Sequence, residues 1–156
     1  MVFSEIRRLE LTDLNRVIEL ERLCFNENNA YNPKQLRYLI KNANSCCLAE
    51  GNKDLIRGFI IALYRNGCDV AGVETLNVDP NHRGMGIGKK LLLAAEEEMY
   101  PRAIKRIRLE VSTGNKTAIN LYERSGFRIT SLLKNYYIHQ YFGSLDAFRM
   151  VKELVT

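Results

Sequence analysis

The sequence predicts an α/β fold in which a mixed β-sheet carries helices on both faces. Several short segments alternate apolar and polar residues, as strands do, and others repeat apolar residues at helical spacing, with turn residues between them. Their order along the chain is β-α-α-β-β-β-α-β-α-β-β. The 156 residues contain no internal repeat and no linker rich in Pro or Ser, so we expect a single domain over 1–156.

The first elements are a strand and two helices. Residues 4–11 alternate apolar and charged residues and predict a strand, after which Thr12 is the expected cap of a helix that ends near Phe25. The segment 26–32 is rich in asparagine, which favours turns. Pro33 suits the first turn of a second helix, which we expect to continue to residue 42.

The middle of the chain predicts three consecutive antiparallel strands. Glycine and polar turn residues separate three segments rich in apolar and β-branched residues, at 46–50, 55–65 and 69–78. A helix is expected over 86–100, where apolar residues recur at helical spacing until Pro101 stops it.

The last part of the chain predicts a strand, a helix and two further strands. Apolar residues alternate along the strand at Ile107, Leu109 and Val111. The helix covers 115–125, and Gly126 follows it in the position of a left-handed cap. The final strands are expected at 127–138 and 146–153.

Composition excludes several classes of protein. Hydrophobic residues make up 46% of the chain and charged residues 26%, as in ordinary globular domains. No apolar run approaches the roughly 18 residues of a membrane span. Charged residues stand where an export signal would need its apolar region, so we expect a cytoplasmic protein without membrane association. The four cysteines have no C-x-x-C spacing and only two histidines accompany them, so we expect free thiols and no metal site.

The net charge of +5 favours ligands that carry phosphate. The basic residues are scattered over separate elements instead of forming one stripe. A cofactor with phosphate groups therefore explains the charge as well as nucleic acid does.

Three glycines at alternate positions form the most informative motif, in the segment Asn-His-Arg-Gly-Met-Gly-Ile-Gly-Lys-Lys at 81–90. We expect Gly84, Gly86 and Gly88 to adopt positive φ and to bring backbone N–H groups close to a ligand. The helix behind them adds the positive end of its dipole, which suits a phosphate. The spacing excludes both the G-x-G-x-x-G dinucleotide fingerprint and the P-loop. The alternative is a glycine-rich turn that only connects strand to helix.

Two motifs together give the chain a resemblance to the GNAT superfamily of acetyl-CoA-dependent N-acetyltransferases. The segment 83–88 matches the acetyl-CoA signature Arg/Gln-x-x-Gly-x-Gly/Ala. A second signature appears in full as Asn115, Ala118, Leu121, Tyr122, Gly126 and Phe127. The order of predicted elements agrees with the family, so the resemblance spans nearly the whole chain.

The resemblance extends to one branch of this family. Leu-Glu-Val at 109–111, Asn-Tyr-Tyr at 135–137 and Asp-Ala at 146–147 look like the enzymes that acetylate protein N-termini, both the bacterial ribosomal-protein alanine acetyltransferase and its archaeal counterparts. This implies a protein or peptide α-amine as acceptor, with a ribosome as a possible partner. Alternatives are a lysine side chain, a polyamine or another small amine, and a non-catalytic module that binds CoA or nucleic acid. Intact Glu110, Asn115 and Tyr122 argue against the non-catalytic alternative.

The resemblance also implies an acetyl-CoA site. Backbone groups of Leu76, Asn77 and Val78 would pair with the pantetheine arm, and Asn115 would hydrogen-bond it. Backbone amides of the loop that follows the strand at 69–78 would hold the pyrophosphate. This loop is made of Arg83, Gly84, Met85, Gly86, Ile87, Gly88 and Lys89. The lysine that closes this loop is alternatively an exposed helix residue.

In the same branch, the residue matching Glu110 is the general base, acting through water, and the residue matching Tyr122 protonates the leaving thiolate. The alternatives are a surface ion pair of Glu110 with neighbouring arginines and a core role for Tyr122. Deprotonation at pH 7 costs about 1.4 kcal/mol for an α-amine and about 4.6 kcal/mol for a lysine. A single carboxylate acting through water therefore suits the α-amine better.

The acceptor side is implied to have aromatic walls. The loop between the first two helices and the paired tyrosines of the related enzymes would contribute Phe25, Tyr31, Tyr136 and Tyr137. An acidic residue that some archaeal relatives place before the matching tyrosine is replaced here by asparagine or alanine, and Glu27 is the nearby candidate to replace it.

Overall fold

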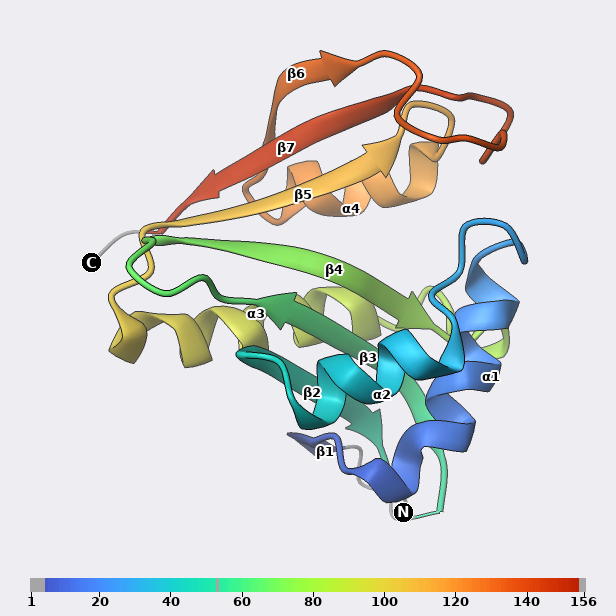
Figure 1. The fold of residues 1–156 in the computed structure, drawn as a ribbon, viewed down its shortest axis with the longest axis vertical. Helices are drawn as coiled ribbons and strands as arrows, with labels where there is room; N and C mark the ends of the chain where they lie inside the picture. Colours follow the sequence, from blue (N-terminus) through green and yellow to red (C-terminus); the bar gives the residue numbers. More distant parts are fainter. Residues whose placement is uncertain (1–4, 53, 155–156) are drawn as a thin grey trace.

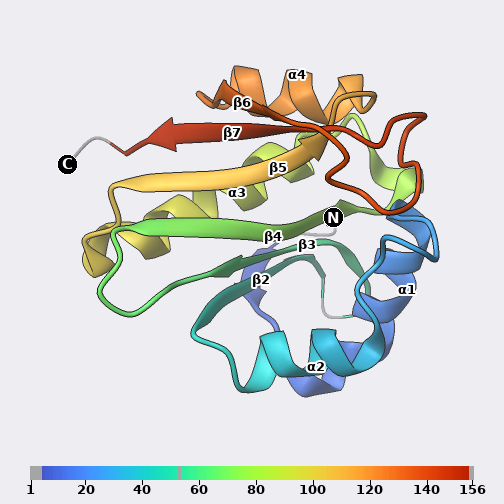
Figure 2. The same cartoon turned by 45° about the horizontal axis from the view of Figure 1, so that its top comes forward.

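The computed structural model describes residues 5–52 and 54–154, and it has the mixed α/β architecture that the sequence predicts. Seven strands form one sheet in the order β1-β2-β3-β4-β5-β7-β6. All neighbours pair antiparallel except β4 and β5, which are parallel. Helices cover both faces, with α1 and α2 on one side and α3 and α4 on the other (Figures 1 and 2).

The N-terminal half contains β1 (Glu5–Arg8), α1 (Leu14–Cys24), α2 (Pro33–Lys41), β2 (Ser45–Gly51) and β3 (Ile56–Leu63). The first strand is shorter than the expected 4–11, of which residue 4 lies outside the described residues, because a short 3-10 turn begins at Leu11. The prediction that Thr12 caps α1 is wrong. Asp13 fixes this turn instead, since its carboxylate accepts the N–H of Glu10 at 2.8 Å and both Nη atoms of Arg7 at 2.9 Å.

The C-terminal half contains β4 (Val70–Val78), α3 (Ile87–Met99), β5 (Arg106–Ser112), α4 (Lys116–Arg124), β6 (Arg128–Leu133) and β7 (Ala147–Glu153). The expected strand 127–138 therefore ends five residues early. Asn135 has a φ of 54°, and its N–H donates to the Asp146 carboxylate at 2.9 Å, which turns the chain into the loop before β7.

Two apolar clusters hold the helices on the sheet. One lies between the sheet and the α3 and α4 side, and it includes Leu91, Leu109 and Met150. The other lies under α1 and α2, where Leu20, Leu36 and Phe59 are fully buried. No helix in the described part of the chain has the length and apolar composition that a membrane crossing needs.

Gly58 in β3 lies where α3 packs closely on the sheet. A Cβ atom at this position would lie 2.7 Å from the Asn77 carbonyl oxygen and 3.1 Å from Ile87 Cγ2. We expect Gly58→Ala to lower the free energy of unfolding by about 1–3 kcal/mol, because the added methyl group overpacks this contact. Urea denaturation checks this, with Leu93→Ala on the exposed side of α3 as a control that changes stability by about 0.5 kcal/mol. Unchanged stability of Gly58→Ala would contradict the packing argument.

Candidate active site

The centre of the sheet is interrupted where β4 and β5 separate. They pair only from Val70 with Arg106 to Gly72 with Arg108, and beyond this point they diverge (Figure 1). β5 remains paired with β7 as far as Ser112, and β4 remains paired with β3 as far as Val78. In the part of the chain that the structure describes, the edge of β4 that faces β5 therefore has no neighbouring strand after Gly72.

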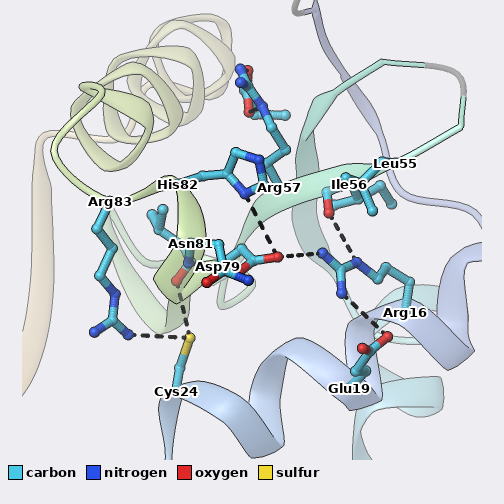
Figure 3. Close-up of polar contacts among 12 residues, drawn as sticks. Arg16, Glu19, Cys24, Leu55, Ile56, Arg57, Asp79, Asn81, His82 and Arg83 are labelled. Atoms are coloured by element: carbon cyan, nitrogen blue, oxygen red, sulfur yellow. Dashed lines mark hydrogen bonds and ion pairs between the residues drawn. The ribbon is translucent and has the colours of Figure 1, made fainter.

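Backbone direction along β4 alternates, which decides which groups point into this gap. The N–H of Asp79 donates to Arg57 of the β3 side at 2.7 Å, so Asn77 also directs its backbone toward β3. Leu76 and Val78 then direct their N–H and C=O groups into the gap. The Cys24 thiol, from the end of α1, donates to the Val78 carbonyl at 3.3 Å (Figure 3).

The side chain of Asn77 belongs to a buried polar network under α1. Glu21, only 1% exposed, accepts hydrogen bonds from Asn77 Nδ2 at 3.0 Å and Thr75 Oγ1 at 2.8 Å. Its second oxygen accepts the N–H of Tyr31 at 3.0 Å. This one carboxylate therefore joins β4 to the loop between α1 and α2. Burial raises the pKa of Glu21 above its ordinary value, and the hydrogen bonds oppose that rise.

The glycine loop lies at the C-terminal end of β4 and has the open backbone that an anion needs. Gly84 and Gly86 have φ values of 79° and 78°, and a Cβ at either would meet no heavy atom within 4 Å. No side chain caps the N-terminus of the 13-residue α3, so its first N–H groups face the loop. The residues present therefore fit a pyrophosphate group.

Gly88 does not adopt the positive φ that its spacing predicts, because it lies inside α3. It is buried, and a Cβ there would lie 3.0 Å from Leu121 Cδ2 and 3.8 Å from Val78 Cγ2. Its small size lets α3 approach α4 and β4 closely.

An ion-pair network holds the entrance of this loop (Figure 3). Asp79 accepts Arg16 Nη2 at 2.7 Å and the N–H of Asn81 at 2.9 Å. The hydrogen bond from Asn81 and the charge of Arg16 hold the pKa of Asp79 below its usual value despite burial. Arg83 lies beside Cys24, with 3.7 Å between Nη2 and Sγ. The start of the loop is thus tied to α1.

Glu110 and Tyr122 lie on opposite faces of the sheet. Glu110 is on the face of β5 opposite to Leu109, and its side chain is 16% exposed. Its contacts with Arg108 Nε at 3.7 Å and Arg149 Nη2 at 3.8 Å are ion pairs longer than hydrogen bonds. Tyr122, on α4, is buried and packs against Phe127 with ring centroids 5.7 Å apart. Burial raises the pKa of Tyr122 to about 12, so its phenol is protonated at neutral pH.

An aromatic cluster joins the loop before β7 to the end of α1. Phe25 stacks on Tyr141 at 5.5 Å, Tyr137 lies 5.6 Å from Tyr141, and Tyr136 meets Tyr137 edge-on at 5.0 Å. Burial raises the pKa of Tyr137, and the nearby Tyr136, Glu110 and Tyr122 raise it further. Tyr137 therefore lies near both expected catalytic residues.

Tyr31 approaches from the opposite loop and contacts a residue that the sequence did not single out. Its hydroxyl donates to Glu74 Oε2 at 2.6 Å, and burial together with this contact raises its pKa. Glu74 is the extra residue of a β-bulge in β4, where the register with β3 shifts. Glu27 lies exposed in the turn, so the carboxylate at Tyr31 comes from the sheet.

Several neighbours of the site were not predicted, since they become neighbours only through strand register and loop packing. They are Glu21, Glu74, Tyr141 and Arg149. Only the high density of aromatic residues between 136 and 142 gave a sequence signal, and it pointed to Tyr141.

Comparison with known proteins gives the site its context. The model of the acetyltransferase (GNAT) family matches residues 14–127. The chain belongs to the GNAT acetyltransferase family. The sequence-based prediction of family and fold is therefore confirmed, and this is a family of N-acetyltransferases that use acetyl-CoA.

Relatives in sequence include enzymes that modify protein N-termini. A [ribosomal protein bS18]-alanine N-acetyltransferase of Haemophilus ducreyi is 31% identical over 129 residues, covering 80% of this chain and 83% of that protein. An N-alpha-acetyltransferase of Sulfurisphaera tokodaii is 30% identical, covering 85% and 84%. The chain also matches an uncharacterized protein of Mycobacterium leprae, at 31% identity, of which it spans only 40%.

Solved structures agree with the fold. The ribosomal-protein alanine N-acetyltransferase of Escherichia coli has a TM-score of 0.86 at 25% identity, covering 99% of this chain and 96% of that one. A PaiA N-acetyltransferase from Thermoplasma acidophilum in complex with coenzyme A has a TM-score of 0.79 at 25% identity, covering 97% and 99%.

The buried Glu21 network generates a prediction for stability. Glu21→Gln can accept fewer hydrogen bonds, so we expect the free energy of unfolding at pH 7 to fall by about 1–3 kcal/mol. Folding raises the pKa of Glu21, so the folded state binds the proton of this carboxyl more tightly than the unfolded state does. The contribution of Glu21 to the free energy of unfolding therefore declines as the pH rises above 4.5, the pKa of the unfolded state. The advantage of wild type over the variant is therefore largest below pH 4.5 and shrinks above it. Urea denaturation between pH 4 and 8 checks the trend, and a growing difference with pH would contradict it.

Proposed function

We propose that this GNAT enzyme transfers an acetyl group to the α-amine of a protein or peptide N-terminus. The observation that carries the proposal is that Glu110 is on β5 beyond the last residue paired with β4, with Tyr122 on the opposite face of the sheet and Tyr137 near both. Supporting it are the two curated relatives named for N-terminal acetylation, both more than 80% covered by this chain.

The donor site in this proposal uses the gap and the glycine loop. Acetyl-CoA would supply the acetyl thioester that the acceptor amine attacks directly, within a ternary complex. Leu76 and Val78 offer backbone groups to the pantetheine arm, and the N–H groups from Gly84 to Lys89 bind the pyrophosphate. Asn115 uses its side-chain oxygen to cap α4, at 3.2 Å from the Ala118 N–H, which leaves amide N–H donors for a pantetheine carbonyl.

The two catalytic residues have separate roles. Glu110 accepts the proton that the amine loses, through a water molecule, and its carboxylate has the freedom to do so because its arginine contacts are not hydrogen bonds. Tyr122 is fully protonated at neutral pH and donates to the departing sulfur. The phenol reaches this position from the face of the sheet opposite to Glu110.

The energetics favour an α-amine over a lysine or polyamine. Deprotonation at pH 7 costs about 3 kcal/mol less for an α-amine than for a lysine, and Glu110 is the one carboxylate on the open face of β5. The aromatic residues Tyr31, Tyr136 and Tyr137, together with Phe25, enclose the acceptor's first residues.

The acceptor class is tested with peptides that differ at the N-terminus. Each peptide is paired with an N-terminally blocked version that retains a lysine, and spermidine serves as the polyamine probe. We expect acetyl-CoA turnover with free N-termini only, verified by mass spectrometry of the product. Turnover confined to the blocked peptides or to spermidine would overturn the α-amine proposal.

The catalytic roles are tested by two isosteric substitutions. We expect Glu110→Gln and Tyr122→Phe each to lower kcat by about 10²–10⁴-fold, because each removes one proton transfer. Acetyl-CoA affinity, measured by calorimetry, should stay within a factor of about two, since neither group binds the pyrophosphate. Wild-type turnover in either variant would remove that residue from the mechanism.

A further inference from the structure

Two arginines lie on either side of Glu110 without a full set of partners. Arg108 precedes Glu110 by two residues on β5, and Arg149 lies directly opposite Glu110 on β7. Both contact this carboxylate only at 3.7 and 3.8 Å. Within the described residues, 5–52 and 54–154, the buried Nε atoms of both have no hydrogen-bond partner. One carboxylate thus serves two guanidinium groups, and neither is satisfied.

An arginine elsewhere on the same face of the sheet is fully paired, unlike Arg108 and Arg149. Arg106 points to the same face two residues earlier, and its Nε donates to both oxygens of Glu153 at 3.0 and 3.1 Å. A surface arginine in this sheet can therefore acquire a complete carboxylate partner. Arg108 and Arg149 retain donor capacity beside the catalytic base, where guanidinium groups bind carboxylates in a bidentate manner.

A small pocket lies beside Arg108, between the β3–β4 turn and the start of β4. It has a volume of about 100 Å³, and its lining includes Arg65, Gly72, Glu74 and Arg108. Gly72 has no side chain, and a Cβ there would lie 3.8 Å from Glu74 Oε1 and 4.0 Å from Arg108 Nη2. The pocket therefore gives an acidic substituent of the acceptor space beside the Arg108 guanidinium.

The charges around the pocket are divided by position. The lining has two basic groups, Arg65 and Arg108, and one acidic group, Glu74, which already accepts the Tyr31 hydroxyl. Glu110 and Arg149, next to Arg108 but outside the lining, add one charge of each sign, so an excess of positive charge remains. A cationic substituent would add to that excess, whereas a carboxylate would neutralise it.

We propose that the acceptor carries an acidic side chain within its first two residues and that Arg108, assisted by Arg149, binds its carboxylate. Residues two apart on a strand are separated by about 6.6 Å, and successive residues of an extended peptide by about 3.3 Å. A peptide with its amine at Glu110 therefore brings the side chain of its first or second residue to Arg108. The proposal rests on the proposed N-terminal acetyltransferase function and specifies its substrate class.

The test compares peptides with free N-termini that differ only at residue two, which is Asp, Ala or Lys in otherwise identical sequences. We expect kcat/KM of wild type for the Asp peptide to exceed that for the Ala and Lys peptides by about tenfold or more, from one charged hydrogen-bonded pair. A second series with Asp, Ala or Lys as the first residue covers the other position. Equal rates in both series, or a preference for Lys, would overturn the acidic preference alone.

Variants assign the preference to the arginine. Arg108→Gln should bring the ratio of kcat/KM for the Asp and Ala peptides to about one. Arg108→Glu should make kcat/KM for the Lys peptide larger than that for the Asp peptide. The readout is a ratio between peptides, so an effect of either variant on Glu110 cancels. Arg106→Gln, on the same face but paired with Glu153, is the matched control that keeps the wild-type ratio. A wild-type ratio in folded Arg108→Gln would overturn the assignment to Arg108. The same ratio measured for Arg149→Gln tests separately whether Arg149 assists.

The same assay separates the two levels of the proposal. Absence of α-amine acetylation for every free peptide, with acetylation of lysine side chains instead, would overturn the proposed function and this inference together. Acetylation of all free N-termini at one rate would leave the function intact and overturn only the acidic preference.

Discussion

The structure depends on the loss of backbone pairing between β4 and β5 after Gly72. β4 stays paired with β3 as far as Val78 and β5 with β7 as far as Ser112, so beyond Gly72 the facing edges of β4 and β5 have no strand partner among the described residues. Unpaired backbone groups inside a protein are costly and call for a partner. The divergence therefore leaves a free edge on β4, which binds the donor in the proposed reaction.

In the proposed reaction the two faces of the sheet serve different reactants. Tyr122 and the glycine loop lie on the side of α3 and α4. Glu110 is on the opposite face of β5, and α1 and α2 do not extend over β5 (Figure 2). Donor and acceptor would then approach from opposite faces of the sheet, as direct transfer requires.

The order of apolar and polar residues predicted most helices and strands, because the periodicity of each element depends on residues close in sequence. They failed where the outcome depended on partners far away. Thr12 and Asp13 are both acceptable caps by type, and the Arg7 contact decides between them. Gly88 shares its spacing with Gly84 and Gly86, yet it lies in the helix, where its size matters through Leu121. Similarly, strand pairing brings Arg149 opposite Glu110, and loop packing brings Tyr31 to Glu74. Neighbouring residues in the sequence do not reveal these contacts.

Helix α1 connects the two halves of the site more directly than any strand does. From one helix, Arg16 binds Asp79 at the entrance of the glycine loop, Glu21 binds β4 and the Tyr31 backbone, and Cys24 contacts the Val78 carbonyl. A shift of α1 would therefore move the glycine loop and Tyr31 together. Because these hydrogen bonds are buried or part-buried, and those of Arg16 and Glu21 involve ionisable side chains, breaking one leaves an unsatisfied group at a cost in stability. The position of Tyr31, at the proposed acceptor site, thus depends on the same helix that contacts the glycine loop.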